Sequence, residues 1–278
     1  MTQASQPLSI DALKPGDVLL HMGKGELSKL IAWVGDSEYS HAAMVVEGGQ
    51  LIEAAAAGVR HAGLPERTRM VANFQFIDVY RPLRPDPGND KDRAAMLASI
   101  NTYLGRPYPM TSLFTLGIAC AVRNKIPGDP AFREFVRVAL DLVINNDSNQ
   151  VVCSELVYRG FDEAATKPAH ALRLKIITRP VQGTPLPRID LAALLIESLD
   201  DYKRSRPQTR GHNPFEATAE HDEGDIDELV LQARAQLGLD ASMRASKGDY
   251  APNPKTILPA DLQFSPGLTR LGRLAMRA

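Results

Sequence analysis

Four short apolar segments separated by turn signals fill the first third of the chain, and they constrain the fold most. They cover 17–21, 40–46, 51–55 and 74–80. Between the second and third segments, Glu47-Gly48-Gly49-Gln50 is a hairpin signal, because glycine adopts positive φ at little cost. Segments this close in sequence pair as antiparallel neighbours, since the parallel strands of a βαβ unit need a longer crossover. The sequence therefore predicts a small antiparallel sheet.

Helical periodicity dominates the middle of the chain. Three apolar stripes recur at three- and four-residue spacing, and each predicts the buried face of a helix. They are Met96 to Leu104, Phe132 to Val143 and Leu156 to Ala164. The third stripe extends back to Cys153 by the same spacing, which places this residue in the first turn of a helix. Strands followed by helices predict an α+β fold, with a small antiparallel sheet or half-barrel packed against helices.

Composition divides the chain into a main domain and a polar insertion. Residues 11–202 have the mixed content of a globular domain, whereas 203–255 are polar and include an acidic cluster. We expect this second segment to be a partly disordered excursion, and residues 256–278 to return to the domain. Basic and acidic residues nearly cancel, at a net charge of −1. The charge therefore predicts no binding to nucleic acid.

The sequence also bears on location and cofactors. The N-terminus has neither the basic nor the apolar region of a secretory signal, so we expect a cytoplasmic protein or one exported without such a signal. The longest apolar run, Ser112 to Val122, is about half the length of a spanning helix, so no integral membrane segment is expected. Cys120 and Cys153 form no CxxC motif, and no His/Cys group has zinc-ligand spacing, so we expect no metal or other cofactor. Nothing in the sequence specifies an oligomeric state.

Cys153 and His41 can form a nucleophile and its base. Unpaired N–H groups and the dipole at a helix N-terminus favour a thiolate, and a nearby imidazolium lowers the thiol pKa further. His41 lies on the expected strand 40–46, which would hold the base in one orientation. Glu53 lies on the next strand, where its carboxylate would fix the imidazole tautomer. Each of these residues taken alone is more often a structural residue than a catalytic one.

Hairpin geometry decides whether Glu53 can reach His41. A two-residue turn at Gly48-Gly49 would pair Met44 with Glu53 and put Glu53 on the opposite face from His41. A three-residue loop or a bulge would put both side chains on the same face. We expect one of these two arrangements.

Five ordered motifs give these residues a context. They are Gly16-Asp17-Val18-Leu19-Leu20, Ser40-His41-Ala42-Ala43-Met44-Val45, Ile52-Glu53-Ala54 with Gly58-Val59, Gly105-Arg106-Pro107-Tyr108, and Val152-Cys153-Ser154-Glu155-Leu156-Val157. Together they resemble the circularly permuted NlpC-type papain-like cysteine amidohydrolases of the YiiX/YebB-like type. In unpermuted relatives the cysteine helix precedes the histidine strand, and here the order is inverted. The resemblance covers roughly residues 14 to 162, and Pro259 to Leu268 looks like the family's terminal Pro-x-Asp-Leu segment.

The resemblance implies a papain-like fold and assigns three catalytic roles. Cys153 is similar to the family's nucleophile, His41 to its general base and acid, and Glu53 to the residue that orients the histidine. The implied reaction is cleavage of an amide bond through a thioacyl-enzyme. Peptide stems of cell-wall polymer, isopeptides and N-acyl lipids are candidate substrates. A lipid acyltransferase or (thio)esterase using the same residues, and a non-catalytic binding module on the same fold, are the alternatives.

Further residues are assigned more simply. The expected substrate-binding residues are Tyr108, beside the cleft, and Ser40 and Ser154, which flank His41 and Cys153. The other histidines have no spaced partners, and they are His21, His61, His170, His212 and His221. Cys120 lies in an apolar stretch where a small buried hydrophobe is expected.

Overall fold

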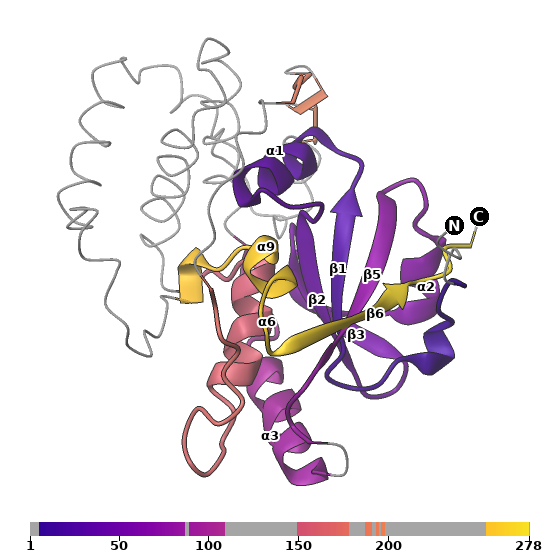
Figure 1. Cartoon of the computed structure of the whole chain (residues 1–278). Coiled ribbons are helices and arrows are strands. Elements are labelled where there is room, and N and C mark those ends of the chain that lie inside the picture. Colours follow the sequence, from indigo (N-terminus) through magenta and orange to yellow (C-terminus); the bar gives the residue numbers. More distant parts are fainter. Residues whose placement is uncertain are drawn as a thin grey trace, which may run out of the picture.

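The computed structural model describes residues 6–86, 89–108, 149–177, 187–190, 193–194, 196–197 and 254–277. These residues form a six-stranded antiparallel sheet with the strand order β4-β3-β2-β1-β5-β6, accompanied by helices (Figure 1). The α+β prediction with an antiparallel sheet is confirmed. The expected helix at Phe132 to Val143, Cys120, and residues 203–253 of the expected polar excursion lie outside the described residues, and the domain boundaries stay predictions. Among the described helices, none combines the length and the apolar character needed to cross a membrane.

The elements follow the predicted order and add several that the sequence pattern did not reveal. The strands are β1 (Val18–Gly23), β2 (His41–Val46), β3 (Gln50–Ala55), β4 (Gly58–Gly63), β5 (Phe74–Pro82) and β6 (Leu268–Arg273). The helices are α1 (Glu26–Gly35), α2 (Leu64–Arg69), α3 (Asp90–Asn101), α6 (Cys153–Asp162) and α9 (Pro259–Gln263), with 3-10 helices at Ile10–Ala12 and Pro254–Thr256. The additions are α1, β4, α2 and β6.

The hairpin between β2 and β3 has the three-residue loop that places the site. Gly48 and Gly49 occupy this loop with φ of +71° and +69°, a conformation that glycine adopts readily. The register pairs Ala43 with Glu53. Because side chains alternate along a strand, His41 and Glu53 point to the same face of the sheet. The expectation of a loop that restores this common face is confirmed.

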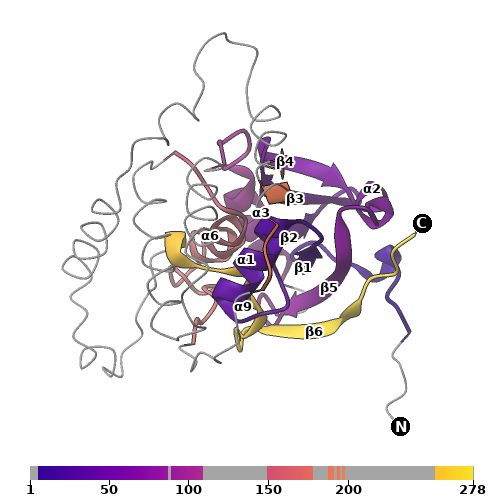
Figure 2. The same ribbon diagram turned by 90° about the horizontal axis from the view of Figure 1, so that it is seen from above.

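Apolar side chains cover both faces of the sheet. On one face, α3 and α6 pack against the strands in a cluster that includes Val18, Leu20, Met44, Ile52, Ile100, Leu156 and Phe161. On the other face, a smaller cluster includes Leu19, Val45, Leu51, Leu64, Ile77, Val79 and Leu274. Figure 2 shows α6 and α2 on opposite sides of the strands. The alternation of side chains puts His41 and Glu53 on the α2 face, and His41 is the first residue of its strand.

Residues 105–107 and Val151, which flank residues 109–148 in the sequence, connect the start of α6 to β4. Three backbone hydrogen bonds make this junction: Val59 N–H to Arg106 O (2.8 Å), Gly105 N–H to Val59 O (2.9 Å) and Val151 N–H to Pro107 O (3.1 Å). Gly58 has φ of +91°, and a Cβ there would lie 2.7 Å from the Arg106 carbonyl oxygen. The Gly58-Val59 and Gly105-Tyr108 motifs thus meet next to the residues that precede Cys153.

The C-terminal segment pairs with the sheet and also contacts α6. Strand β6 pairs with β5 at the edge of the sheet. The Ser154 hydroxyl donates a hydrogen bond to the Ile257 carbonyl over 2.5 Å. In Figure 1, α9 and β6 are drawn in yellow next to α6 and β5. The first turn of α6 is therefore fixed by residues about a hundred positions later in the chain.

Candidate active site

Cys153 is the first residue of α6. Val152 before it is extended, with φ of −88° and ψ of 162°, and its N–H donates to the Glu155 carboxylate over 3.3 Å. This contact fixes the helix start, because a carboxylate in the first turn satisfies a backbone donor. The backbone N–H groups of Ala42 and Ser154 donate hydrogen bonds to the Cys153 sulfur. The thiol is therefore surrounded by donors although it is 4% exposed.

The Cys153 and His41 side chains are hydrogen bonded to each other. Burial opposes ionisation of the thiol, but the charge and hydrogen bond of His41, with the two backbone donors, bring the pKa of Cys153 below its ordinary value. Burial likewise opposes protonation of the imidazole, yet Cys153 and Glu53 raise the pKa of His41 to about 9. Both shifts have the same cause, since each charged partner stabilises the other. The contact therefore favours the thiolate–imidazolium form of the pair over the neutral thiol and imidazole.

Glu53 binds the other side of the imidazole. Its Oε2 lies 2.9 Å from Nε2 of His41, which leaves Nδ1 as the ring nitrogen for Cys153. The Glu53 side chain is 1% exposed. Burial would raise its pKa, but His41 and Arg67 hold the pKa of this carboxyl far below its usual range. The structure thus brings the three residues predicted as catalytic together in the order thiol, imidazole, carboxylate.

Two arginines that the sequence reasoning missed bind the second oxygen of Glu53. Nη2 of Arg67 lies 2.5 Å from Oε1, and Nη2 of Arg60 lies 3.1 Å from the same atom. The Arg67 guanidinium also lies over the Phe74 ring, 4.9 Å from its centroid. Strand β4 pairs Arg60 directly with Glu53. The six-residue α2 that carries Arg67 has no apolar stripe long enough to predict it.

His21 lies beside His41, contrary to the expectation that it has no partner. The register of β1 and β2 pairs the two residues, and their ring centroids are 5.1 Å apart. His21 is fully buried, and burial is the main cause that lowers its pKa well below the ordinary value. Its ring is therefore neutral. Neither ring nitrogen makes a hydrogen bond within the described part of the chain.

The expected substrate-binding residues have other partners or positions. Ser40 is buried, and its Oγ accepts a hydrogen bond from Gly23 N–H over 3.0 Å. Ser154 donates to the Ile257 carbonyl, as described above. Tyr108 is partly buried and packs against the α3 and α6 cluster. Substrate contacts from these three residues stay predictions.

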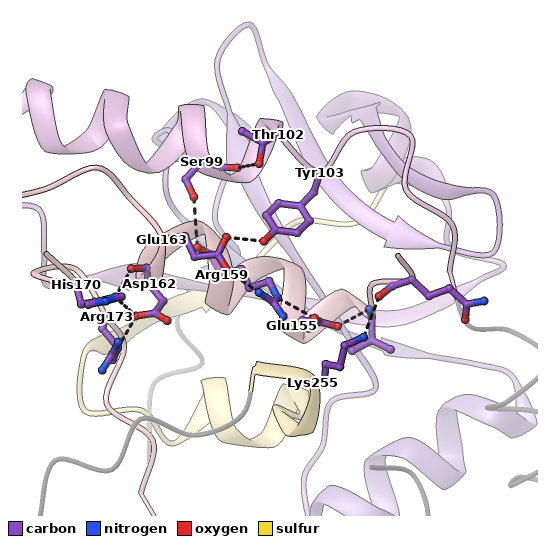
Figure 3. Close-up of polar contacts among 12 residues, drawn as sticks. Ser99, Thr102, Tyr103, Glu155, Arg159, Asp162, Glu163, His170, Arg173 and Lys255 are labelled. Atoms are coloured by element: carbon purple, nitrogen blue, oxygen red, sulfur yellow. Dashed lines mark hydrogen bonds and ion pairs between the residues drawn. The ribbon is translucent and has the colours of Figure 1, made fainter. Parts of the chain in front are cut away.

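Polar contacts fix the remainder of α6 (Figure 3). Arg159 donates to Glu155 over 2.8 Å and to Glu163 over 2.5 Å, so one guanidinium joins two turns of the helix. The Tyr103 hydroxyl donates to Glu163 over 2.5 Å, which ties α6 to the end of α3. Glu155 thus complements the helix start and also anchors Arg159. The described residues contain no group of three or more His, Cys, Asp or Glu side chains placed to hold a metal ion.

Comparison with known proteins finds similarity in structure rather than in sequence. No family model matches the chain, and no curated protein matches it. Among solved structures, it is similar to the crystal structure described as "metalloprotein yiiX from Escherichia coli O157:H7, DUF1105". The identity is 16% and the TM-score is 0.42, and the match covers 93% of this chain and 96% of that chain.

Proposed function

We propose that the protein is a cysteine hydrolase that cleaves an amide bond through a thioacyl-enzyme. The observation that carries this proposal is a chain of two contacts. The Cys153 sulfur contacts the His41 imidazole, and Nε2 of the same imidazole contacts the Glu53 carboxylate. A nucleophile, a base and a residue that orients the base are the three roles that such a reaction needs. The inverted order of the histidine strand and the cysteine helix supports the further proposal of a permuted papain-like half-barrel.

In the first step, the Cys153 thiolate attacks the carbonyl carbon of the amide, and a carbon–sulfur bond forms. The imidazolium of His41 then donates its proton to the amide nitrogen, so that the carbon–nitrogen bond breaks and a neutral amine leaves. In the second step, neutral His41 takes a proton from water, and the hydroxide attacks the thioester. The carbon–sulfur bond breaks, the carboxylic acid leaves, and the thiolate and imidazolium are restored.

Backbone N–H groups at the start of α6 would donate hydrogen bonds to the negatively charged oxygen of the tetrahedral intermediate. The first N–H groups of a helix have no partner within the helix, and the Cys153 N–H is one of them. A donor aimed at the developing oxyanion acts only in the transition state, which makes it effective for catalysis. Glu53 contributes differently, because its charge balances the imidazolium and its position fixes which ring nitrogen faces the sulfur.

Trapping of an acyl group on Cys153 tests the proposal directly. The protein would be incubated with three separate pools, namely N-acyl amides, peptide-stem fragments and acyl esters, then quenched and analysed by mass spectrometry. We expect an adduct on Cys153 from an amide pool, and its mass identifies the acyl half. An adduct from the ester pool alone would instead support the acyltransferase or (thio)esterase alternative.

Two controls make the trapping experiment decisive. Cys153→Ser should give no thioester adduct, and His41→Ala should reduce adduct formation because the thiol is then largely protonated. Adducts that form equally on Cys120, or on Cys153 in the presence and absence of His41, would contradict the proposed mechanism. Absence of any adduct, combined with an unactivated thiol, would favour the binding module.

A further inference from the structure

We propose that Arg67 is a positioning residue of this site: it binds Oε1 of Glu53 and thereby holds the carboxylate with Oε2 facing His41. The inference rests on the proposed function and extends the site from three residues to four. Arg67 would touch neither the substrate nor the reacting atoms. It would act only through Glu53.

The two oxygens of Glu53 have separate partners. Oε2 lies 2.9 Å from His41 Nε2, and Oε1 lies 2.5 Å from Arg67 Nη2. A carboxylate held at both oxygens cannot rotate without breaking an ion pair. Since the His41 ring takes its orientation from Oε2, the contact at Oε1 also determines how the imidazole faces Cys153.

Arg67 is more deeply buried in the site than Arg60. The Arg67 side chain is 3% exposed, whereas that of Arg60 is 50% exposed. The Arg67 guanidinium lies over Phe74, and this same ring stacks on His41 at a centroid distance of 6.5 Å and an angle of 29°. Solvent weakens an exposed ion pair, so Arg60 contributes less charge to Glu53 than Arg67 does.

The hydrogen bonding of Arg67 is incomplete, which argues against a purely stabilising role. Its Nε and Nη2 are buried and make no hydrogen bond among the described residues, so the contact with Glu53 is an ion pair of poor hydrogen-bond geometry. A buried guanidinium with unused donors is costly, and a hydrophobic residue would serve packing better. A charge retained at such a cost next to a carboxylate and an imidazolium points to a role in the site.

The groups that face Glu53 come from four elements. They are His21 of β1, His41 of β2, Arg60 of β4 and Arg67 of α2. His21 is neutral and Arg60 is half exposed, which leaves Arg67 as the permanent buried charge. Without it, burial would favour the protonated form of Glu53 at a higher pH, and a protonated Glu53 cannot balance the imidazolium.

The test follows the reactivity of Cys153 with iodoacetamide from neutral to acidic pH, in a Cys120→Ser background. Arg67→Met should shift the loss of reactivity to higher pH and lower the rate at acidic pH by roughly 10–100-fold, the size found for residues that orient a ligand through another group. Arg67→Lys should recover part of the rate. Arg60→Met is the matched control, because it removes a charge from the same oxygen, and it should change the profile much less.

Two further readouts separate positioning from structure. In a Glu53→Gln chain, Arg67→Met should have no additional effect on the rate, since its influence passes through Glu53. The proton resonance of His41 Nε2–H should shift in Arg67→Met and remain in Arg60→Met. If Arg67→Met does not fold by circular dichroism, Arg67→Gln carries the same comparison, because it also removes the charge but keeps a polar group at this position.

The outcomes distinguish the inference from the proposed function. If wild-type Cys153 reacts no faster than an unfolded thiol, or is unaffected by His41→Ala, the proposed function fails. If the wild type is activated but the Arg67 variants keep its pH profile, or if their losses simply add to that of Glu53→Gln, the role of Arg67 fails alone.

Discussion

Replacing Gly58 with alanine tests how the cysteine helix is seated. Gly58 has φ of +91°, and the new Cβ would lie 2.7 Å from the Arg106 carbonyl oxygen. A backbone oxygen cannot rotate away, so the stretch from Arg106 to Pro107 has to move. This stretch receives the Val151 N–H, two residues before Cys153. The substitution should therefore disturb the nucleophile from a distance.

The magnitude follows from a matched control. Gly49 also has positive φ, +69°, but a Cβ there would meet nothing within 4 Å. Gly49→Ala should thus cost only the conformational strain, about 1–2 kcal/mol. Gly58→Ala adds an overpacking cost of about 1–3 kcal/mol. We expect its free energy of unfolding to fall by roughly 2–5 kcal/mol in total.

Urea unfolding monitored by circular dichroism measures the stability of both variants, and iodoacetamide labelling of folded protein measures the Cys153 thiol. We expect Gly58→Ala to lose more stability than Gly49→Ala and to label more slowly. Equal losses of stability would show that the carbonyl contact is unimportant. A labelling rate that stays at the wild-type value in a destabilised Gly58→Ala would refute the link between this junction and the site.

Three more predictions concern charge in the site and sheet. Iodoacetamide should alkylate Cys153 much faster than Cys120 at neutral pH, and His41→Ala should lower the Cys153 rate by roughly tenfold or more, as followed by mass spectrometry. Because the pKa of Glu53 is lower in the folded protein, its ionised carboxylate stabilises the fold at pH values above its unfolded pKa of about 4.3. This stabilisation is lost as the pH falls through the lower pKa of the folded protein. Glu53→Gln should therefore unfold in urea with about 3–5 kcal/mol less free energy at neutral pH, and this deficit should shrink in strong acid, whereas a pH-independent deficit would contradict the assignment. Asp78 is buried between two arginines of β6 and a tyrosine. Asp78→Asn should therefore lower the free energy of unfolding by about 1–3 kcal/mol in the same assay, and an unchanged value would show that these contacts are not stabilising.

The sequence predicts the parts of the site that depend on local pattern. Apolar spacing places Cys153 at a helix start, and the hairpin signal at Gly48-Gly49 leads to the loop that brings Glu53 to the His41 face. These predictions succeed because helix and strand periodicity are properties of neighbouring residues. The Cys153 to His41 contact joins residues that are far apart in sequence, and here the ordered motifs supply the information that periodicity lacks.

The parts missed by sequence reasoning depend on tertiary pairing. Strand β4 reads Gly-Val-Arg-His-Ala-Gly, which has little β propensity, and it forms because β3 offers an edge to pair with. Arg67 follows in a helix of six residues, too short for a helical pattern. His21 meets His41 only through the register of β1 and β2. The pairing of strands fixes all three positions, and no single segment carries that information.

Strand β6 has a consequence for how the chain folds as it is made. Its Arg273 contacts Asp78 of β5 from 195 residues away. At a synthesis rate of about 5–20 residues per second, the edge of β5 would wait roughly 10–40 s on the ribosome for its partner. An unpaired edge is a template for aggregation during that interval. Ile257, which accepts the hydrogen bond from Ser154, is made 103 residues after it, so the nascent chain cannot complete the nucleophile helix before Ile257 has been synthesised.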